Sequence, residues 1–199
     1  MTSVAQPGIV APYITEWSEE SCLDHDLVER RGFGIAYADE SVVDRDDDHV
    51  LWLRTKSRPR EGRPLFGRVH PYRQRRAMRR MLCQVCGGPS TCSRDGALWL
   101  LQDHREDWTD WPERMAVTEP PVCLPCVATS NRLCPALRKS SVVVLAKESP
   151  VVGVYGMVYR SGHPSPIPTG KRTVGFDDPA IQWVVAASLL RELRGCSIV

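Results

Sequence analysis

The sequence predicts an α+β fold, in which a small mixed body with a C-terminal helix carries a structural zinc module, inserted in it or packed on it. Two CxxC pairs near the middle of the chain predict the metal module, short β-type runs lie on both sides of it, and capping residues at both ends of one late segment predict the final helix. Of the 199 residues, 42% are hydrophobic and 25% charged, which is typical of a globular protein rather than of a disordered or fibrous one.

The first region, residues 1–53, is acidic and is expected to contain two short strands, at residues 35–37 and 50–53. The run between them, residues 44–49, contains four Asp and reads as a hairpin loop. Several carboxylates in a row could hold a hard cation, but the spacing of EF-hand ligands is absent. We therefore interpret this run as a solvated loop.

The second region, residues 54–82, is predicted to be an arginine-rich arm followed by a helix. Residues 54–68 alternate basic residues with Pro and Gly, so they are expected to be extended or looped. Pro71 suits a first helical turn, and good helix formers continue to Leu82. Met78, Met81 and Leu82 give this helix one apolar stripe, and arginines occupy most of its remaining circumference.

The third region, residues 83–139, carries the strongest signal in the chain, two CxxC pairs separated by thirty-six residues. Two residues between thiolates let both sulfurs reach one tetrahedral ion at about 2.3 Å, and a second pair closes the site without leaving a position for water. A structural Zn²⁺ is therefore expected, since zinc suits an all-thiolate site in a reducing compartment. The predicted ligands are Cys83, Cys86, Cys123 and Cys126.

Other interpretations of these thiols stay open. An iron–sulfur centre or redox dithiols are alternatives to zinc. Cys92 and Cys134 lie near the two pairs and could replace a ligand or form a second site, although small buried hydrophobes are the simpler interpretation. Gly87 and Gly88 follow the first pair and allow the positive φ that a tight metal-binding turn requires.

The order of elements around the cysteines resembles a treble clef. The first CxxC precedes a strand at residues 97–101, and the second opens a helix that Pro135 interrupts. With Asp103 and His104 between the pairs, this stretch of about 55 residues resembles the HNH-type treble-clef family. The resemblance implies a nuclease in which His104 activates water and Asp103 lies near a divalent ion.

Two departures from the family pattern argue against cleavage. No Asn precedes Cys123, and Asn131, on the other side of the second pair, is the only Asn in the chain. Cys126 is followed by Val127 rather than by a His. Because phosphodiester hydrolysis needs more than one ligand to hold the metal ion against the phosphate, we treat the HNH-like nuclease as an alternative only.

The last region, residues 140–199, is predicted to be a β-hairpin followed by the C-terminal helix. Strands are expected at residues 142–145 and 151–159, with a Pro- and Gly-rich loop at residues 161–170. Asp177 or Asp178 can cap a helix that begins at Pro179 and ends at Gly195, with a broad apolar face between them. No motif in this region points to a particular chemistry.

The formal net charge of +2 hides a strong asymmetry along the chain. Residues 1–50 hold three Arg against twelve Asp or Glu, a net of −9, whereas residues 51–80 hold eleven Lys or Arg against one Glu, a net of +10. Ten of those eleven are Arg, whose planar fork matches phosphate. We therefore expect non-catalytic binding of nucleic acid, with phosphate contacts from Arg68, Arg73, Arg75, Arg76, Arg79 and Arg80.

The same charges also fit two alternatives. The acidic N-terminal region could fold over the basic block and neutralise it, or the zinc module could serve as a scaffold that docks an acidic protein partner. No run approaches the roughly 18 apolar residues of a membrane span, and the N-terminus has no basic, apolar leader. We therefore expect no membrane contact and a cytoplasmic location.

Overall fold

The computed structural model describes residues 11–199 and has a mixed α+β fold in which strands dominate. Its helices are α1 (Pro71–Arg80), α2 (Leu124–Leu133) and α3 (Pro135–Lys139), together with the 3-10 helix η1 (Pro179–Trp183). Its strands are β1 (Thr15–Trp17), β2 (Leu27–Arg30), β3 (Gly34–Tyr37), β4 (Leu51–Trp52), β5 (Pro64–Val69), β6 (Cys92–Ser93), β7 (Gly96–Gln102), β8 (Ala116–Val117), β9 (Ser141–Glu148), β10 (Val151–Arg160), β11 (Ile167–Gly175), β12 (Val184–Glu192) and β13 (Arg194–Ile198).

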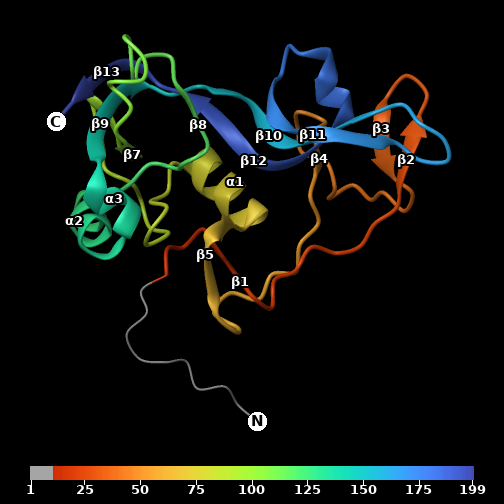
Figure 1. The fold of residues 1–199 in the computed structure, drawn as a ribbon, viewed down its shortest axis with the longest axis horizontal. Helices are drawn as coiled ribbons and strands as arrows, with labels where there is room; N and C mark the ends of the chain where they lie inside the picture. Colours follow the sequence, from red (N-terminus) through yellow and green to blue (C-terminus); the bar gives the residue numbers. More distant parts are fainter. Residues whose placement is uncertain (1–10) are drawn as a thin grey trace.

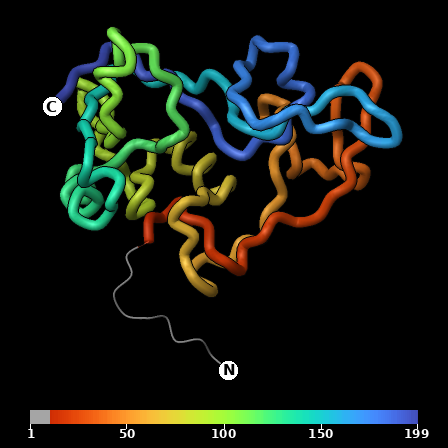
Figure 2. The backbone as a smooth tube through the Cα atoms, viewed as in Figure 1, coloured from red at the N-terminus to blue at the C-terminus, as the bar shows by residue number. Residues whose placement is uncertain are grey.

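Two larger sheets lie next to each other, with α1 between them and the β1–β5 pair (Figure 1). The first has the strand order β11–β10–β12–β4, with β8 pairing the far end of β12, and the second has the order β13–β9–β7–β6. Two-stranded pairs, β1–β5 and β2–β3, complete the described fold. The acidic segment after residue 11 and the basic segment around residues 55–69 run side by side, as the antiparallel pairing of β1 with β5 requires (Figure 2).

Helix α1 packs against β12. Of its predicted apolar stripe only Met78 lies in the core, because the helix ends at Arg80 and the partly buried Met81 and Leu82 follow it. Pro71 occupies the first turn, as expected, and Met81 adopts a left-handed conformation that ends the helix. Met78 is fully buried. The buried side chain of Gln74 accepts a hydrogen bond from Leu189 N at 2.9 Å and donates to Leu189 O at 3.0 Å. The helix is therefore fixed to the sheet by polar as well as apolar contacts.

The predicted C-terminal helix is wrong. Asp178 does cap a helical turn, accepting from Ala180 N at 2.8 Å, but that turn is only η1. The chain then enters β12, which lies between β10 and β4 and is buried on both faces along most of its length. A strand covered on both faces reads as a continuous apolar run, and such a run mimics the broad apolar face of a helix.

Both predicted hairpins are also wrong. The strands β9 and β10 fall on residues predicted to be extended, but β9 pairs β7 and β13, whereas β10 pairs β11 and β12. Likewise β3 pairs β2, and β4 lies parallel to β12. The two strands of each predicted hairpin thus pair with other strands and not with each other. The predicted loop at residues 161–170 is shorter than expected, since β11 begins at Ile167.

Several local predictions are confirmed. The strand expected at residues 97–101 lies within β7, and the helix after the second CxxC pair is α2, separated from α3 at Pro135. Over residues 11–199, no helix combines the length and the apolar character that a membrane crossing requires.

Candidate metal centre and basic surface

The four predicted zinc ligands come together. One sulfur from each of Cys83, Cys86, Cys123 and Cys126 lies within 4.8 Å of all the others, and the Cys86 and Cys123 sulfurs are 3.8 Å apart. Four sulfurs at about 2.3 Å from a central Zn²⁺ form a tetrahedron with edges of about 3.8 Å. The donor set and its spacing therefore fit one tetrahedral ion. In the described part of the chain, no other group of three or more Cys, His, Asp or Glu ligand atoms converges in this way.

The first pair is held by a tight turn directly after α1. Cys83 N donates to Gly88 O at 2.7 Å, and Gly87 N donates to Cys83 O at 2.8 Å. Gly87 has a φ of +74°, as predicted for this turn, whereas Gly88 does not need a positive φ. A Cβ on Gly87 would also lie 2.8 Å from the ring of Tyr13. The turn is thus covered by the chain that precedes β1, where Tyr13 N donates to Val85 O at 2.9 Å.

The second pair lies at the N-terminus of α2. Cys123 precedes the first turn, and Cys126 N donates back to Cys123 O at 2.9 Å. The amide of Leu124 donates to Thr91 Oγ1 at 2.8 Å, which links the start of α2 to the segment before β6. Cys83 shares a buried apolar cluster with residues of β7 and α2 and with the segment before α2, namely Leu98, Leu100, Val122 and Val127. Packed apolar side chains therefore support the cysteine cluster.

The environment of the sulfurs favours the thiolate of Cys83 and opposes those of Cys86 and Cys126. Around Cys83, burial opposes ionisation, but the N–H groups of Cys86, Cys123 and Val85 hold the thiol pKa below its usual value. Burial raises the pKa of Cys86 and of Cys126, and the neighbouring sulfurs raise it further. A bound cation would compensate for this clustered negative charge.

The two nearby cysteines are not members of the cluster. Cys92 is exposed and its sulfur lies 3.2 Å from Ser90 Oγ, so its interpretation as a small buried hydrophobe is wrong. Cys134 is partly buried at the junction of α2 and α3.

The two residues assigned to catalysis by the HNH resemblance are near each other in sequence but have different partners. Both carboxylate oxygens of Asp103 accept from Arg105, at distances from 2.6 to 3.1 Å. His104 Nδ1 lies 2.7 Å from Asp107 Oδ2, and its ring meets Trp111 edge-on. Sequence reasoning missed Asp107, although its spacing of three residues from His104 was a usable signal.

Most of the predicted phosphate-binding arginines make contacts within the protein. Arg73 is buried and donates to both oxygens of the buried Glu20, at 2.7 and 2.6 Å, and to Thr15 O at 2.6 Å. Arg76 donates to Tyr13 Oη at 2.9 Å. These contacts are intramolecular pairings between the basic block and the N-terminal region.

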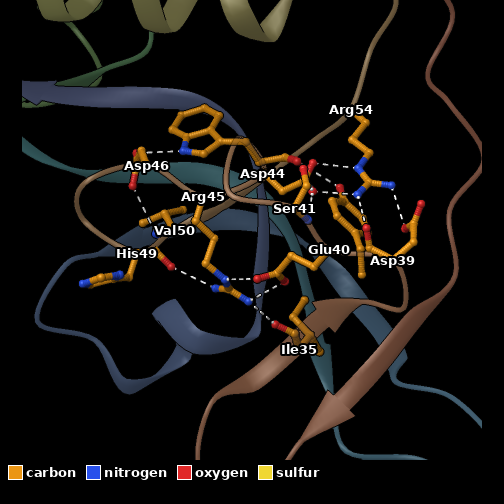
Figure 3. Close-up of polar contacts among 12 residues, drawn as sticks. Ile35, Asp39, Glu40, Ser41, Asp44, Arg45, Asp46, His49, Val50 and Arg54 are labelled. Atoms are coloured by element: carbon orange, nitrogen blue, oxygen red, sulfur yellow. Dashed lines mark hydrogen bonds and ion pairs between the residues drawn. The ribbon is translucent and has the colours of Figure 1, made fainter.

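Arg79 shows the same pairing with the acidic loop. It donates to Asp46 at 2.9 Å and to Asp48 at 3.0 Å. Asp46 also accepts from the indole N–H of Trp52 at 2.7 Å and from Val50 N at 3.1 Å (Figure 3). This loop is ordered by hydrogen bonds rather than simply solvated.

Three further ion pairs, made by two arginines, anchor the acidic region, and Figure 3 shows them. Arg54 donates to Asp44 at 2.6 and 2.7 Å and to Asp39 at 2.8 Å. Arg45 donates to Glu40 at 2.8 Å. Hydrogen bonding from Arg54 lowers the pKa of Asp44 to about 2, against the opposing effect of burial. The Asp44 carboxylate is therefore strongly stabilised in its charged form.

A set of basic side chains stays exposed on the segment between Arg54 and α1. Phe66, 62% exposed, lies among them on β5. Arg68 approaches Glu16 at 3.7 Å but has a side chain that is 69% exposed, and Arg58 pairs loosely with Glu61 at 3.4 Å. Arg80, at the end of α1, is also exposed and forms no ion pair within residues 11–199. We define the basic arm as Lys56, Arg58, Arg60, Arg63, Phe66 and Arg68.

Comparison with protein-family models, with curated proteins and with solved structures found no match to this chain.

Proposed function

We propose that the protein is a zinc-stabilised nucleic-acid-binding protein that does not cleave its ligand and that contacts phosphates through the basic arm. The observation that carries this proposal is the exposed row of cations on residues 56–68 with one exposed aromatic ring among them. Basic residues interleaved with an aromatic platform suit a strand of nucleic acid, because phosphates pair with the cations and a base stacks on the ring.

The contact surface in this proposal is shifted from the helix to the arm. Arg73 is buried against Glu20 and Arg79 is paired with three aspartates, so their charges are already compensated. The arm cations lack such compensation, since exposed ion pairs such as Arg58–Glu61 contribute little in water. Of the six arginines predicted from sequence, only Arg68 belongs to the arm, whereas Arg80 is exposed at the end of α1.

The proposed role of Zn²⁺ is structural. Four sulfur ligands leave no position for water or substrate. The first pair lies in a turn before the β6–β7 hairpin, and the second pair lies at the start of α2, an order that supports a treble-clef-type arrangement. Because α1 ends just before Cys83 and β5 ends just before α1, a bound ion would hold the arm's base in a fixed position.

A salt series tests the proposal. The zinc-loaded protein is expected to bind labelled single-stranded and duplex oligonucleotides with an affinity that falls steeply between about 50 and 200 mM salt. The double variant Arg60→Glu with Arg63→Glu should bind more weakly. Its plot of log affinity against log salt concentration should also be shallower by about 2. The charge-matched control, Arg30→Glu with Arg31→Glu on the β2–β3 hairpin, should bind normally.

Two results would contradict this proposal. Binding that is absent or independent of salt would favour the alternative of a scaffold for an acidic protein partner. Equal effects of the two double variants would show that the arm is not the contact surface.

The His104–Asp107 pair supports a second candidate, an HNH-like nuclease. A carboxylate 2.7 Å from Nδ1 can orient an imidazole that acts as a general base. Plasmid DNA incubated with the protein and Mg²⁺ tests it. The binding proposal predicts intact plasmid, whereas nicking that is lost in the His104→Ala variant would establish the nuclease.

A further inference from the structure

An open cavity of about 630 Å³ lies between the acidic loop, the first residues of the arm and the start of α1. Its size is in the range of pockets that hold small organic ligands. The indole of Trp52, the ring of Tyr72 and the side chain of Leu53 contribute to its lining. The cavity also contains two arginines, Arg54 and Arg75, whose surroundings differ sharply.

Arg54 is neutralised, but Arg75 is not. The two aspartates that line the cavity, Asp39 and Asp44, both accept from Arg54. Arg75 forms no ion pair and no hydrogen bond within residues 11–199, and its Nη1 atom is buried without any partner. Its guanidinium instead stacks on Trp52, with Cζ 4.4 Å from the ring centroid.

The energetic consequence is a cation whose charge the fold compensates only in part. Burial lowers the pKa of Arg75, and the field of Arg79 lowers it further, while Asp46 only partly offsets these effects. Burying a charge without a hydrogen-bonded partner is costly, so such groups are rare unless a ligand completes them.

The start of α1 lies beside the same cavity. His70, Pro71 and Tyr72 line it, and His70 provides no side-chain cap for the helix. The first turn contains no acidic residue of its own to offset the positive end of the helix dipole. Helix N-termini of this kind bind phosphate.

We propose that this cavity is a binding site for a phosphate monoester, with the phosphate beside Arg75 and the N-terminus of α1 and the planar or apolar remainder of the ligand against Trp52 and Leu53. The planar guanidinium group of an arginine matches the spacing of phosphate oxygens, and a bound phosphate dianion would supply the negative partner that Arg75 lacks. The monoester can belong to a free nucleotide or to the 5′ end of a nucleic acid. This site goes beyond the proposed function, because it does not include the exposed cations of the arm.

Calorimetric titration of the zinc-loaded full chain with AMP, and with adenosine as the probe that lacks phosphate, tests the proposal. AMP is expected to bind and adenosine to bind at least tenfold more weakly. Arg75→Met keeps an unbranched side chain over Trp52 and removes the charge, so it should weaken AMP binding by about 10- to 100-fold. Arg76→Met, on the same helix but outside the cavity lining, is the matched control and should bind AMP normally.

Thermal unfolding separates ligand recognition from a structural role of Arg75. If the arginine is present to bind phosphate, Arg75→Met leaves the unliganded protein as stable as wild type or more so, and AMP raises the melting temperature of wild type more than that of the variant. A large loss of stability in this variant with unchanged AMP affinity would overturn the proposal. Failure of wild type to distinguish AMP from adenosine would overturn it too.

The source of the monoester is distinguished by a further comparison. Tighter binding of a 5′-phosphorylated oligonucleotide than of its 5′-hydroxyl counterpart, lost in Arg75→Met, identifies a nucleic-acid end, and equal binding of the two identifies a free ester. The Arg60→Glu and Arg63→Glu double variant should retain its AMP affinity. The proposed cavity and the proposed arm can therefore fail independently.

Discussion

Single residues show how the acidic and basic halves of this sequence fit into one molecule. Asp44, 6% exposed, is held by two hydrogen bonds from Arg54 and by the Ser41 amide. Glu20, which is fully buried, accepts hydrogen bonds from the Arg73 side chain and from the backbone amides of Trp17 and Arg58. These contacts place N-terminal carboxylates against arginines of the following block, so much of the opposite charge is cancelled within the fold.

The Asp44–Arg54 pair predicts an acid-sensitive part of the stability. The pKa of Asp44 falls from 3.8 in the unfolded chain to about 2 in the fold, so its ionisation contributes about 2 kcal/mol to the free energy of unfolding. This contribution is complete above about pH 5 and is lost as the pH falls toward 2. In Asp44→Asn, the free energy of unfolding should therefore depend less on pH between 5 and 2, as measured by urea denaturation. An unchanged pH dependence would contradict this assignment.

Gly87 provides a second prediction for a single residue. Its φ of +74° opposes a side chain, and so does the Tyr13 ring, which lies 2.8 Å from the position that a Cβ would take. Gly87→Ala should therefore destabilise the zinc-loaded protein by about 1–3 kcal/mol in thermal unfolding. Gly88→Ala is the matched control, because its Cβ would meet only Cys86 Sγ at 3.5 Å. Equal losses in the two variants would contradict the argument.

Among the elements, β12 depends on a helix as well as on neighbouring strands. One of its edges pairs β4 at Val185 and Ala186 and pairs β8 at Arg191 and Glu192. Between these two stretches, the amide of Gln74 hydrogen-bonds both Leu189 N and Leu189 O. The Gln74 side chain thus replaces the peptide group of a missing strand.

Removing this amide should be costly. Gln74→Leu leaves the buried Leu189 N–H without its partner and removes a donor from Thr118 O, at about 1–3 kcal/mol for each unsatisfied group. Urea denaturation is therefore expected to give a lower midpoint with an unchanged slope. Gln102→Leu, at an exposed position at the end of β7, should change the midpoint little. A loss in Gln74→Leu no larger than in this control would refute the role of Gln74.

Elements with strong local signals were predictable, and those defined by distant partners were not. Pro71 and a run of helix formers were enough for α1, and CxxC spacing was enough for the sulfur cluster. The strand β12 was not predictable, because residues 184–190 have an apolar face in either a helix or a buried strand. Only its pairing with β10, about thirty residues away, decides between them.

At the scale of the whole molecule, the basic block could be neutralised in two ways, and the sequence did not distinguish between them. The same arginine can pair with a phosphate or with an aspartate of its own chain, and spacing along a helix does not indicate which. The fold pairs Arg73 and Arg79 internally, leaves Arg80 and the arm exposed, and leaves the half-buried Arg75 without a bonded carboxylate. The cavity beside Arg75 was likewise unpredictable, since its lining comes from residues 23 to 75.

The whole molecule should also depend on its metal. Structural zinc sites contribute directly to folding free energy, so a strong chelator is expected to lower the melting temperature and to expose the apolar cluster beneath the cysteines. Circular dichroism and binding of a hydrophobic dye measure both effects. Cys126→Ser should reproduce them without chelator, whereas Cys22→Ser, at an exposed position outside the cluster, should not. A chelator-resistant fold would contradict a structural role for zinc.

Elemental analysis of the protein purified under reducing conditions tests the central claim most directly. Four thiolates converging on one ion predict one equivalent of zinc per chain, with the four cluster sulfurs protected from alkylation until the metal is removed. Negligible zinc together with four freely reactive thiols, or with disulfides within the two pairs, would contradict the account.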